Sequence, residues 1–358
     1  MALGSVAQVG ESRITVGVDT HKDTHTAAVK DQLGRSVGKT QVPATPPGYQ
    51  ELLAWAGSFG EIVEWGIEGT GSYGAGLSRF LKMQGQVVTE VIRPDRKARR
   101  HKGKSDPVDA EAAARSVQAG EATARPKSGD GLVEAIRCLT IARSSAVKAR
   151  TQAINEMKGL VVTAPAELRE DLRSLSVPQL VRTCCGLRAG QVNDAASGLR
   201  FALARLARRC RDLDSEIKEL GSELDRIVPR VAPELVKIHG VGTQVAAQLL
   251  ITAGDNPGRL SSEASFAKLA GVAPLEASSG QVVRHRLNRG GDRLANAALY
   301  RVVVVRMGTD PRTRAYVARR TQEGKTKREI IRCLKRFVAR QVYAVLYPKP
   351  VILNNSAS

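Results

Sequence analysis

The chain has 358 residues, enough for two or three domains that each bury a hydrophobic core. Its 55 lysines and arginines outnumber its 35 aspartates and glutamates, which gives a net charge of +20. This excess predicts a polyanionic partner, either nucleic acid or an anionic membrane surface. No apolar run approaches the roughly 20 residues of a membrane span, and no signal peptide is recognisable, so we expect no membrane association.

The cysteines and aromatic residues further limit the kind of protein and the kind of nucleic-acid contact that are expected. The five cysteines are odd in number and lack metal-ligand spacing, which favours reduced thiols in a cytoplasmic protein. Only 4% of the residues are aromatic, so extensive stacking of bases on rings is not expected. Contacts to backbone phosphates should dominate any binding of nucleic acid.

After a flexible leader over residues 1–11, the N-terminal region reads as a mixed sheet covered by helices. Strands are expected over residues 13–19, 26–30 and 37–42, in an antiparallel arrangement. Further strands over 62–68 and 86–92 alternate with helices that begin at Pro46 and after Gly74. We therefore predict an α/β catalytic domain over residues 1–130.

Acidic residues stand at the ends of these elements. Asp19 and Glu68 each close a predicted strand, and Asp106 and Asp109 stand at the start of a predicted helix that contains Pro107. Residues three apart share a helix face, so both aspartates could point at one ion. The alternative is a capped helix, with Asp106 as its N-cap and Asp109 favoured by the helix dipole.

Four acids from separate segments would converge to bind metal. Two divalent cations about 4 Å apart would relieve the repulsion between carboxylates, which are hard ligands suited to Mg²⁺. Such a pair of ions supports displacement at a phosphodiester. Asp23 and Glu64 are competing acids, and the spacing alone does not exclude them.

A basic segment over residues 93–104 precedes the helix with the two aspartates. Seven of its twelve residues are cationic: Arg93, Arg96, Lys97, Arg99, Arg100, Lys102 and Lys104. A solvated loop is one interpretation. The neighbouring carboxylates favour a segment that grips nucleic-acid phosphates.

The middle of the chain, residues 131–232, is predicted to be helical. It contains an apolar seam with alternating spacings of four and three: Leu199, Leu203, Leu206, Cys210, Leu213, Ile217, Leu220, Leu224 and Ile227. Nine such positions over four heptads indicate a coiled coil, with one helix of a bundle as the alternative. Pro229 and Pro233 are expected to end this helix.

The last region, residues 233–347, is expected to be mainly helical. Gly240 and Gly242 fit a helix-hairpin-helix whose turn presents backbone N–H groups to a phosphate, although a plain glycine-rich connection is the alternative. Ser279 precedes Gly280, and Arg284, Arg286 and Arg289 follow it. A Ser-Gly pair is usually a turn, but these cations make a phosphate-handling site conceivable. A disordered tail is predicted over residues 348–358.

Three segments together resemble the acidic motifs of a known family. They are Val16-Gly17-Val18-Asp19-Thr20-His21-Lys22, Gly66-Ile67-Glu68-Gly69-Thr70-Gly71-Ser72-Tyr73, and Lys104-Ser105-Asp106-Pro107-Val108-Asp109-Ala110. They are similar to motifs of the DEDD transposases of insertion sequences, the IS-one-ten group. The Gly240-Val241-Gly242 turn and Ala270-Gly271-Val272-Ala273-Pro274 with Ser279-Gly280 resemble that family's C-terminal domain. The order and spacing agree over about residues 13–345.

The resemblance implies a RuvC-like RNase H fold, a coiled-coil middle and a helical C-terminal transposase domain. It implies that Asp19, Glu68, Asp106 and Asp109 bind Mg²⁺, as two ions. It implies a serine nucleophile, carried onto Ser279, with Ser278 as the alternative. The family's partners are donor and target DNA and a non-coding bridge RNA, and we expect a homo-oligomer, a dimer or a tetramer.

Two other functions remain open at this point. A Holliday-junction resolvase would share the RuvC-like acids but would need neither Ser279 nor a long coiled coil. A non-enzymatic nucleic-acid binder would explain the charge and the glycine turn, but it leaves the four acids without a role.

Overall fold

The computed structural model describes residues 12–91, 105–188, 190–256, 259–281, 285–286, 288 and 290–348. The predicted leader and tail, the basic segment 93–104, Arg284 and Arg289 lie outside these residues, apart from position 348. The chain forms two units. The first comprises Met1–Asp130 with Gly254–Arg259, and the second comprises Gly131–Ala253 with Leu260–Ser358.

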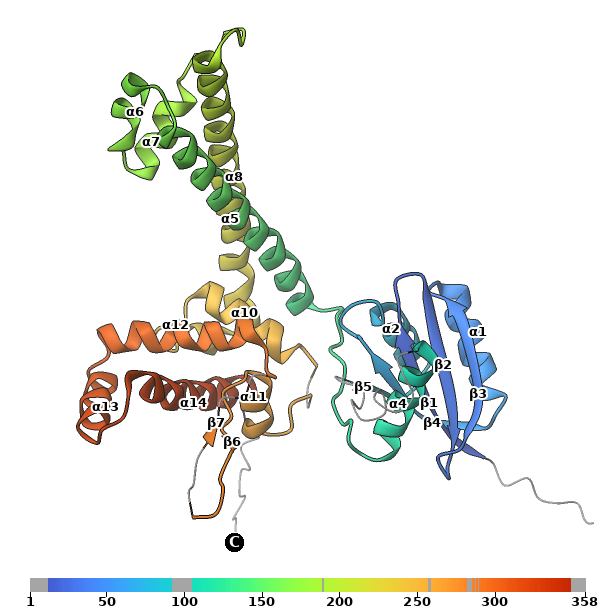
Figure 1. Cartoon of the computed structure of the whole chain (residues 1–358). Coiled ribbons are helices and arrows are strands. Elements are labelled where there is room, and N and C mark those ends of the chain that lie inside the picture. The colour runs from blue at the N-terminus through green and yellow to red at the C-terminus, as the bar shows by residue number, and fades with distance from the viewer. Residues whose placement is uncertain are drawn as a thin grey trace, which may run out of the picture. The chain divides into compact units, whose positions relative to one another are not determined.

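The first unit is built on a five-stranded mixed sheet (Figure 1). Its strands are β1 (Arg13–Thr20), β2 (Thr24–Asp31), β3 (Ser36–Pro43), β4 (Glu61–Glu68) and β5 (Val88–Val91), in the order β3-β2-β1-β4-β5. The first three strands pair antiparallel, whereas β4 runs parallel to β1 and β5 runs parallel to β4. The predicted mixed sheet is confirmed, and the topology is consistent with a RuvC-like RNase H fold.

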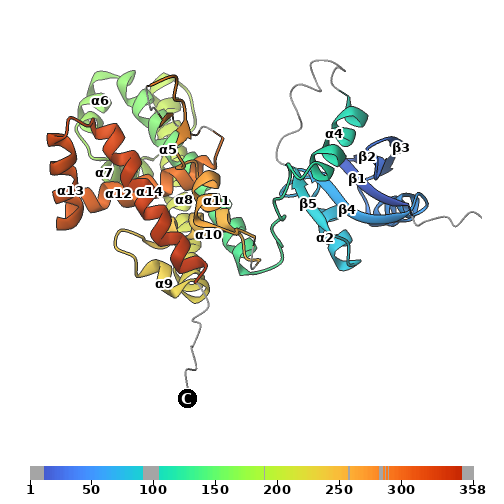
Figure 2. The same ribbon diagram turned by 90° about the horizontal axis from the view of Figure 1, so that it is seen from below.

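Helices cover both faces of this sheet (Figure 2). The helices α1 (Pro46–Gly57) and α2 (Ala75–Met83) pack on the face that carries Val16, Val18, Trp65 and Ile67, all fully buried. The opposite face receives α4 (Asp106–Gln118). Because side chains alternate along a strand, Gly17 and Gly66 face α4.

These two glycines let α4 approach the sheet closely. A Cβ atom at Gly17 would overlap the backbone of Ala110 and Ala114. A Cβ atom at Gly66 would lie 2.7 Å from Val117 Cγ2 and 2.8 Å from the carbonyl oxygen of Ala113. The absence of side chains at two neighbouring strand positions therefore determines where the start of α4 lies above the sheet.

The start of α4 differs from the sequence prediction by one residue. Ser105 occupies the N-cap position with extended backbone, so Asp106 is the first helical residue and is not the cap. Pro107 still falls in the first turn, where a missing N–H costs no hydrogen bond. Both Asp106 and Asp109 remain in the first turn, where the helix dipole favours negative charge.

The segment Gly254–Arg259 belongs to the first unit although it lies far along the chain. The Asn256 side chain donates to the carbonyl oxygen of Pro126 at 3.2 Å. Arg259 Nε donates to the carbonyl oxygen of Arg125 at 3.1 Å, and its side chain is almost fully buried. These polar contacts attach the segment to the last part of the N-terminal region.

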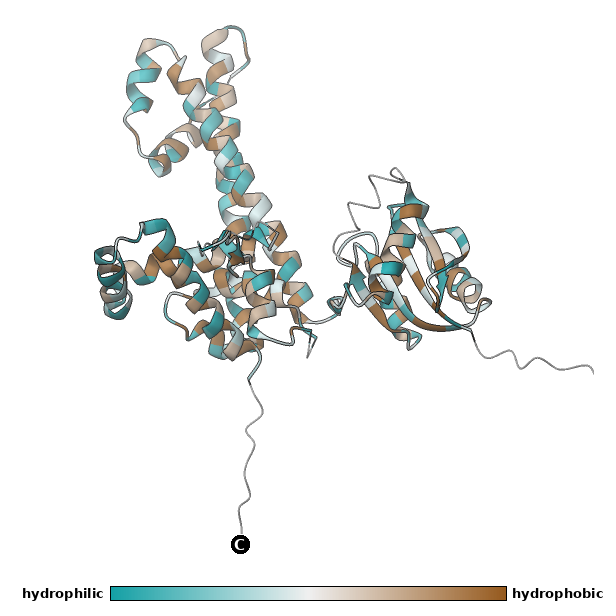
Figure 3. Cartoon of the chain, turned by 60° about the horizontal axis from the view of Figure 1, so that its bottom comes forward, coloured by the Kyte–Doolittle hydropathy of each residue, from teal (hydrophilic) through white to brown (hydrophobic). Residues whose placement is uncertain are grey.

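The second unit contains a long antiparallel helix pair, α5 (Leu132–Val162) and α8 (Ala195–Val231) (Figure 1). Polar and apolar residues intermix along both helices, as expected where one face is buried (Figure 3). At one end the pair packs with α6 (Ala166–Arg173) and α7 (Val177–Cys185) in a cluster that includes Met157, Leu180 and Leu203.

The apolar seam of α8 packs within its own chain at both ends. Leu203 and Cys210 are buried in the cluster with α6 and α7, while Leu224 and Ile227 are buried in a second core. Between them, Leu213, Ile217 and Leu220 are half-buried. The structure thus favours packing against α5 for much of the seam, and a coiled coil between chains stays a prediction.

The sequence prediction that Pro229 ends this helix is wrong. The helix α8 continues through Pro229 to Val231. A proline this close to the C-terminus removes a single intrahelical hydrogen bond, and the helix ends two residues later.

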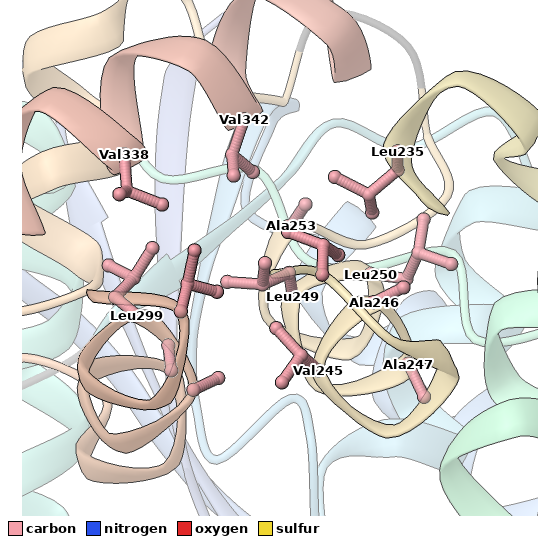
Figure 4. Packing of buried hydrophobic residues seen from close by; sticks show 14 of the residues in the cluster. Leu235, Val245, Ala246, Ala247, Leu249, Leu250, Ala253, Leu299, Val338 and Val342 are labelled. Atoms are coloured by element: carbon pink, nitrogen blue, oxygen red, sulfur yellow. The ribbon is translucent and has the colours of Figure 1, made fainter. Parts of the chain in front are cut away.

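The rest of the second unit forms around one hydrophobic core (Figure 4). Its elements are α9 (Pro233–Val236), α10 (Thr243–Ala253), α11 (Glu263–Leu269), β6 (Leu275–Glu276), β7 (His285–Arg286), α12 (Arg293–Thr309), α13 (Pro311–Gln322) and α14 (Lys327–Leu346). Leu249 of α10, Leu299 of α12 and Val338 of α14 meet in this core, which also takes in Ile136 of α5 and Leu224 of α8. The regions 131–232 and 233–347 therefore share a core. No helix among the described residues is both long and apolar enough to cross a membrane.

Candidate active site and nucleic-acid interface

Three side chains of the first unit converge at one end of the sheet. His21 Nε2 lies 3.3 Å from Asp19 Oδ2 and 3.3 Å from Asp106 Oδ1. One potential ligand atom from each of Asp19, His21 and Asp106 falls within 4.8 Å of the other two. These residues come from a strand, a turn and a helix, so the fold brings them together.

The packing of α4 explains this convergence. Asp19 is two residues after Gly17 on β1 and therefore shares the sheet face that α4 covers. Asp106 begins α4 directly above that face. His21 follows β1 in the turn to β2, where its backbone N–H donates to the carbonyl oxygen of Thr24 at 3.0 Å. The glycine contact thus sets the spacing of the two aspartates.

Asp19 is the more buried of the two aspartates that lie beside His21. Its side chain is 12% exposed, whereas that of Asp106 is 45% exposed. Burial raises the pKa of Asp19, His21 lowers it, and the nearby charges of Asp109 and Asp106 raise it again, with a net increase. Asp109 is itself buried, and its charge acts directly on Asp19. A divalent cation would relieve this repulsion.

Glu68 lies at the same end of the sheet. It is the last residue of β4, two residues after Gly66, so it shares the face that α4 covers. The parallel pairing of Val18 with Ile67 makes it the neighbour of Asp19 in register, and Thr20 Oγ1 donates to its carbonyl oxygen at 2.8 Å. Of the four predicted acids, Asp19 and Asp106 therefore lie in the compact cluster with His21, whereas Asp109 and Glu68 lie at the same end of the sheet but outside that cluster.

The two competing acids lie in different surroundings. Glu64 accepts a hydrogen bond from the hydroxyl of Thr89 on the neighbouring strand β5. Asp23 is exposed in the turn between β1 and β2 and is not part of the cluster formed by Asp19, His21 and Asp106.

The sequence prediction omitted His21 from the site. Two signals could have found it: it follows Asp19 by two residues, and imidazole nitrogen is a common metal ligand. A lone histidine after a strand is a weak pattern, however, and only the position of α4 shows that it lies between two carboxylates.

The donor set at this end of the sheet fits a divalent metal. Carboxylate oxygens prefer Mg²⁺ or Mn²⁺, while an imidazole nitrogen suits transition metals better than Mg²⁺. Asp19 and Asp106 are close enough to share one ion, the charge of Asp109 acts on Asp19, and Glu68 ends the strand that pairs with β1. His21 either ligates or, when protonated, pairs with the two aspartates.

Ser279 lies in the second unit, on the segment between β6 and β7. Leu275 pairs with Arg286 and Glu276 pairs with His285, so the two short strands form a hairpin. Both Ser278 and Ser279 are exposed, as is Arg286. The structure does not distinguish the two serines by burial.

The glycine turn connects α9 to α10. Gly240 has a positive φ of 81°, and a Cβ atom there would lie 3.3 Å from the carbonyl oxygen of Val302 on α12. Gly242 has nothing within 4 Å of an added Cβ atom. Gly240 thus serves the turn and its packing, while Gly242 faces open space at the start of α10. The helix α9 is a single turn, and phosphate binding here stays a proposal.

Comparison with known families gives two matches along the chain. Residues 16–164 match the family model of the DEDD transposases of the IS110 type, described as "Transposase". Residues 232–318 match a model described as "Transposase IS116/IS110/IS902 family". The first match contains all four predicted acids, and the second contains the glycine turn and Ser279.

Individual relatives are also proteins of mobile or invertible DNA. An insertion element IS900 uncharacterized 42 kDa protein of Mycobacterium paratuberculosis is 24% identical over 380 residues, covering 93% of this chain and 95% of the relative. An IS110 protein of Streptomyces coelicolor is 35% identical over 118 residues, covering 33% of this chain and 28% of the relative. A pilin gene-inverting protein of Moraxella lacunata is 32% identical over 115 residues, covering 31% and 35%. With both family models matched in order, the chain belongs to the IS110 family of insertion-sequence transposases.

Proposed function

We propose that this transposase excises and inserts its own insertion sequence, using a metal site in the first unit and a serine nucleophile in the second. The observation that carries the proposal is the convergence of Asp19, His21 and Asp106 beside Asp109 and Glu68. Carboxylates gathered in a protein with a net charge of +20 indicate a cation that a bound polyanion would share.

Asp19, Glu68, Asp106 and Asp109 would hold Mg²⁺, as two ions. Bound there, the ions would supply Lewis-acid stabilisation of charge on the phosphate oxygens. The protein's own contribution is positional, because the sheet and α4 fix the carboxylates before any ligand arrives. When it is protonated, His21 would hold Asp19 and Asp106 together through ion pairs of both carboxylates with its Nε2.

Ser279 would supply the nucleophile. Its Oγ forms a bond to a DNA phosphorus, the bond from phosphorus to one sugar oxygen breaks, and the serine proton ends on the released sugar hydroxyl. The phosphoserine diester conserves the energy of the broken phosphodiester, so a second sugar hydroxyl can reverse the step without a new energy source. The direct neighbour Gly280, with a φ of 57°, favours Ser279 over Ser278 because it forms a tight turn at that position.

The partners follow from the family and the charge. Donor and target DNA are the substrates of a transposase, and the likeness to pilin gene-inverting proteins supports site-specific rearrangement of DNA. The proposal that a bridge RNA selects both DNAs rests on the family resemblance. Handling several strands in one complex favours a homo-oligomer, with the acids and Ser279 supplied by the same or different protomers.

A cleavage assay with Mg²⁺ and with EDTA tests the metal site. Asp106→Asn should lose strand cleavage while it largely keeps DNA binding, since it removes metal-binding charge and leaves the basic surface intact. Asp23→Asn is the matched control, because Asp23 is an exposed acid four residues after Asp19 and outside the cluster. Near-normal cleavage by Asp106→Asn, or cleavage in EDTA, would overturn the assignment.

A second pair of variants tests the nucleophile. Ser279→Ala should lose recombination and keep RNA binding, whereas Ser278→Ala should be much milder. Loss in the reverse order would move the nucleophile to Ser278. A Holliday-junction resolvase would cleave branched DNA in both variants, because it hydrolyses phosphodiesters with water.

A further inference from the structure

A cationic cavity lies beside the hairpin that carries Ser279. Strand β7, the residues leading into β6, the end of α13 and the first half of α14 line it, with Gly271, Arg286, Arg332 and Lys335 among the lining residues. A second cavity shares Gly271, Arg332 and Lys335 and extends towards Asp292 at the start of α12. All these elements belong to the second unit.

Lys335 is the unusual residue of this cavity. The residue is 8% exposed, although lysine is rarely buried without an acidic partner. Its Nζ donates to Asn296 Oδ1 at 2.7 Å, and a neutral amide is a weak compensation for a buried ammonium. Burial and the charge of Arg332 lower the pKa of Lys335. An anion in the cavity would supply the missing opposite charge.

The other charges around the cavity favour the same ligand. Arg320 pairs with Glu323, and Arg336 pairs with Glu263. Among the described residues, no ion pair involves any of three further lining cations, Arg286, Lys325 and Arg332.

Glu329 is the one acid among the described residues that line this cavity, and its charge acts on Lys325 and Arg332 without balancing all four lining cations that lack an ion pair. Its carboxylate caps α14 by accepting from the N–H and the hydroxyl of Thr326 at 2.9 and 2.7 Å. The lining residues therefore carry a surplus of positive charge at a concave surface, which is the arrangement that binds phosphate oxygens.

Asn296 connects this cavity to the serine hairpin. While its Oδ1 accepts from Lys335, its Nδ2 donates to the carbonyl oxygens of Ala270 and Gly271 at 3.1 and 2.9 Å. The segment that continues from Gly271 leads into β6 and then to Ser279. From Pro274, at the cavity wall, five residues of extended chain reach at most about 18 Å. A phosphate in the cavity would therefore lie within a few nucleotides of one that Ser279 could reach.

We propose that this cavity binds a backbone phosphate of DNA, with Lys335 and Arg332 as its principal contacts and Asn296 as the residue that positions Lys335. The choice of DNA over other phosphodiesters rests on the proposed function of Ser279. The binding itself rests on the cavity and its unpaired cations. The site would grip the strand independently of its base sequence and hold it beside the hairpin.

The test is fluorescence anisotropy of the full-length protein with a labelled DNA duplex in EDTA, over a range of salt concentrations. Lys335→Met should weaken binding about threefold to tenfold and reduce the salt slope by about one, since one phosphate contact is lost. Arg340→Met is the matched control, because Arg340 is an exposed cation on the same helix outside both cavities. It should change affinity less than twofold.

Arg332→Gln is a second variant that should fold normally, because Arg332 is exposed and its replacement leaves the core intact. It should weaken DNA binding to a similar extent with an unchanged melting temperature. Unchanged affinity and slope in Arg332→Gln would overturn the proposal, as would a loss restricted to a labelled RNA of equal length. Cleavage plays no part in this readout, so failure of the cavity proposal and failure of the serine mechanism are separately detectable.

Discussion

The acid-bearing end of the first unit and the serine hairpin of the second unit differ in how firmly the fold holds them. Asp19 and Asp109 are buried between a sheet and a helix that contact each other closely through two glycines. Ser279 is exposed between two strands of two residues each. A packed core fixes the position of the acids, whereas a short hairpin positions Ser279.

This difference suggests a division of labour. A metal site needs its ligands preorganised, because the repulsion between carboxylates must be overcome by the fold before the metal binds. A nucleophile that forms a covalent bond to DNA needs access to a bulky substrate, and exposure gives that access. We expect the bound DNA to fix the position of Ser279, while the acids are already in place without it.

Gly17→Ala is expected to have the largest effect, because it should disturb the packing that fixes the acids. The new methyl group would overlap the backbone of Ala110 and Ala114, so α4 must move away from the sheet and take Asp106 and Asp109 with it. We expect a loss of about 3 kcal/mol or more in the free energy of unfolding, together with loss of metal binding. Chemical denaturation and metal titration monitored by calorimetry measure both effects.

Gly57→Ala is the control for this substitution, because Gly57 lies at the end of α1 with nothing within 4 Å of an added Cβ atom. It should be neutral or slightly stabilising. A stable Gly17→Ala protein that binds metal normally would show that α4 does not set the geometry of the acids.

Asp19→Asn distinguishes the role of Asp19 in metal binding from its effect on the stability of the fold. The folded state raises the pKa of Asp19 by burial and by the charges of Asp109 and Asp106, against the effect of His21. Without metal, the free energy of unfolding should therefore fall as the pH rises from the unfolded pKa to the folded pKa, and the deficit persists at neutral pH. Asp19→Asn should remove this deficit, raising the metal-free melting temperature while abolishing cleavage.

Scanning calorimetry with and without Mg²⁺ checks this prediction. The unmutated protein should melt at a higher temperature with Mg²⁺ present, and the variant should show no such increase. A metal-free variant that is less stable than the unmutated protein would mean that Asp19 is a structural residue.

The helix pair of the second unit provides an intermediate effect. Leu203→Lys places a charge in the buried cluster of α6, α7 and α8 and should cost about 3 kcal/mol of stability, which thermal melting measures. Lysine at both Leu213 and Leu220, which are half-buried, should cost less but reduce the mass measured by light scattering. An unchanged mass would assign the whole seam to packing within one chain.

The smallest effect is expected at Glu111, on α4. Burial would raise the pKa of Glu111, but the hydrogen bond and charge of Lys39, at 2.6 Å, lower it overall. The pair therefore stabilises the fold above the ordinary glutamate pKa, and this contribution is lost as the pH falls through the lower folded value.

Glu111→Gln should remove this acid sensitivity at a cost of up to about 1 kcal/mol at pH 7, because Lys39 is half-exposed. Glu121→Gln, at an exposed acid after α4, should leave the profile unchanged. Identical pH profiles for both variants would show that the pair contributes nothing to stability.

Much of the first unit was predictable from the sequence. Strands rich in β-branched residues, such as Arg13–Thr20, were found within one or two residues at each end, because their alternation matches a pleated sheet. The start of α4 was one residue out, since Ser105 and Asp106 are both good cap residues. The roles of Gly17 and Gly66 could not be read from the sequence, because they depend on which helix covers which face.

In the second unit, the sequence pattern predicts the helices but not the partners against which they pack. The seam from Leu199 to Ile227 predicted a long helix, and the structure has that helix, but the period does not say which partner covers it. The sequence did not indicate that Lys335 is buried, because it is one of many lysines and arginines in a basic chain. Its burial appears only when α12 and α14 pack together around Asn296.

The most direct test of the account is to map the covalent bond between protein and DNA by mass spectrometry after reaction with donor DNA and the proposed bridge RNA. We predict an adduct on the peptide that contains Ser279, dependent on Mg²⁺ and absent from Asp106→Asn. An adduct on another residue, an adduct of equal yield in Asp106→Asn, or hydrolysed product without any adduct would contradict it.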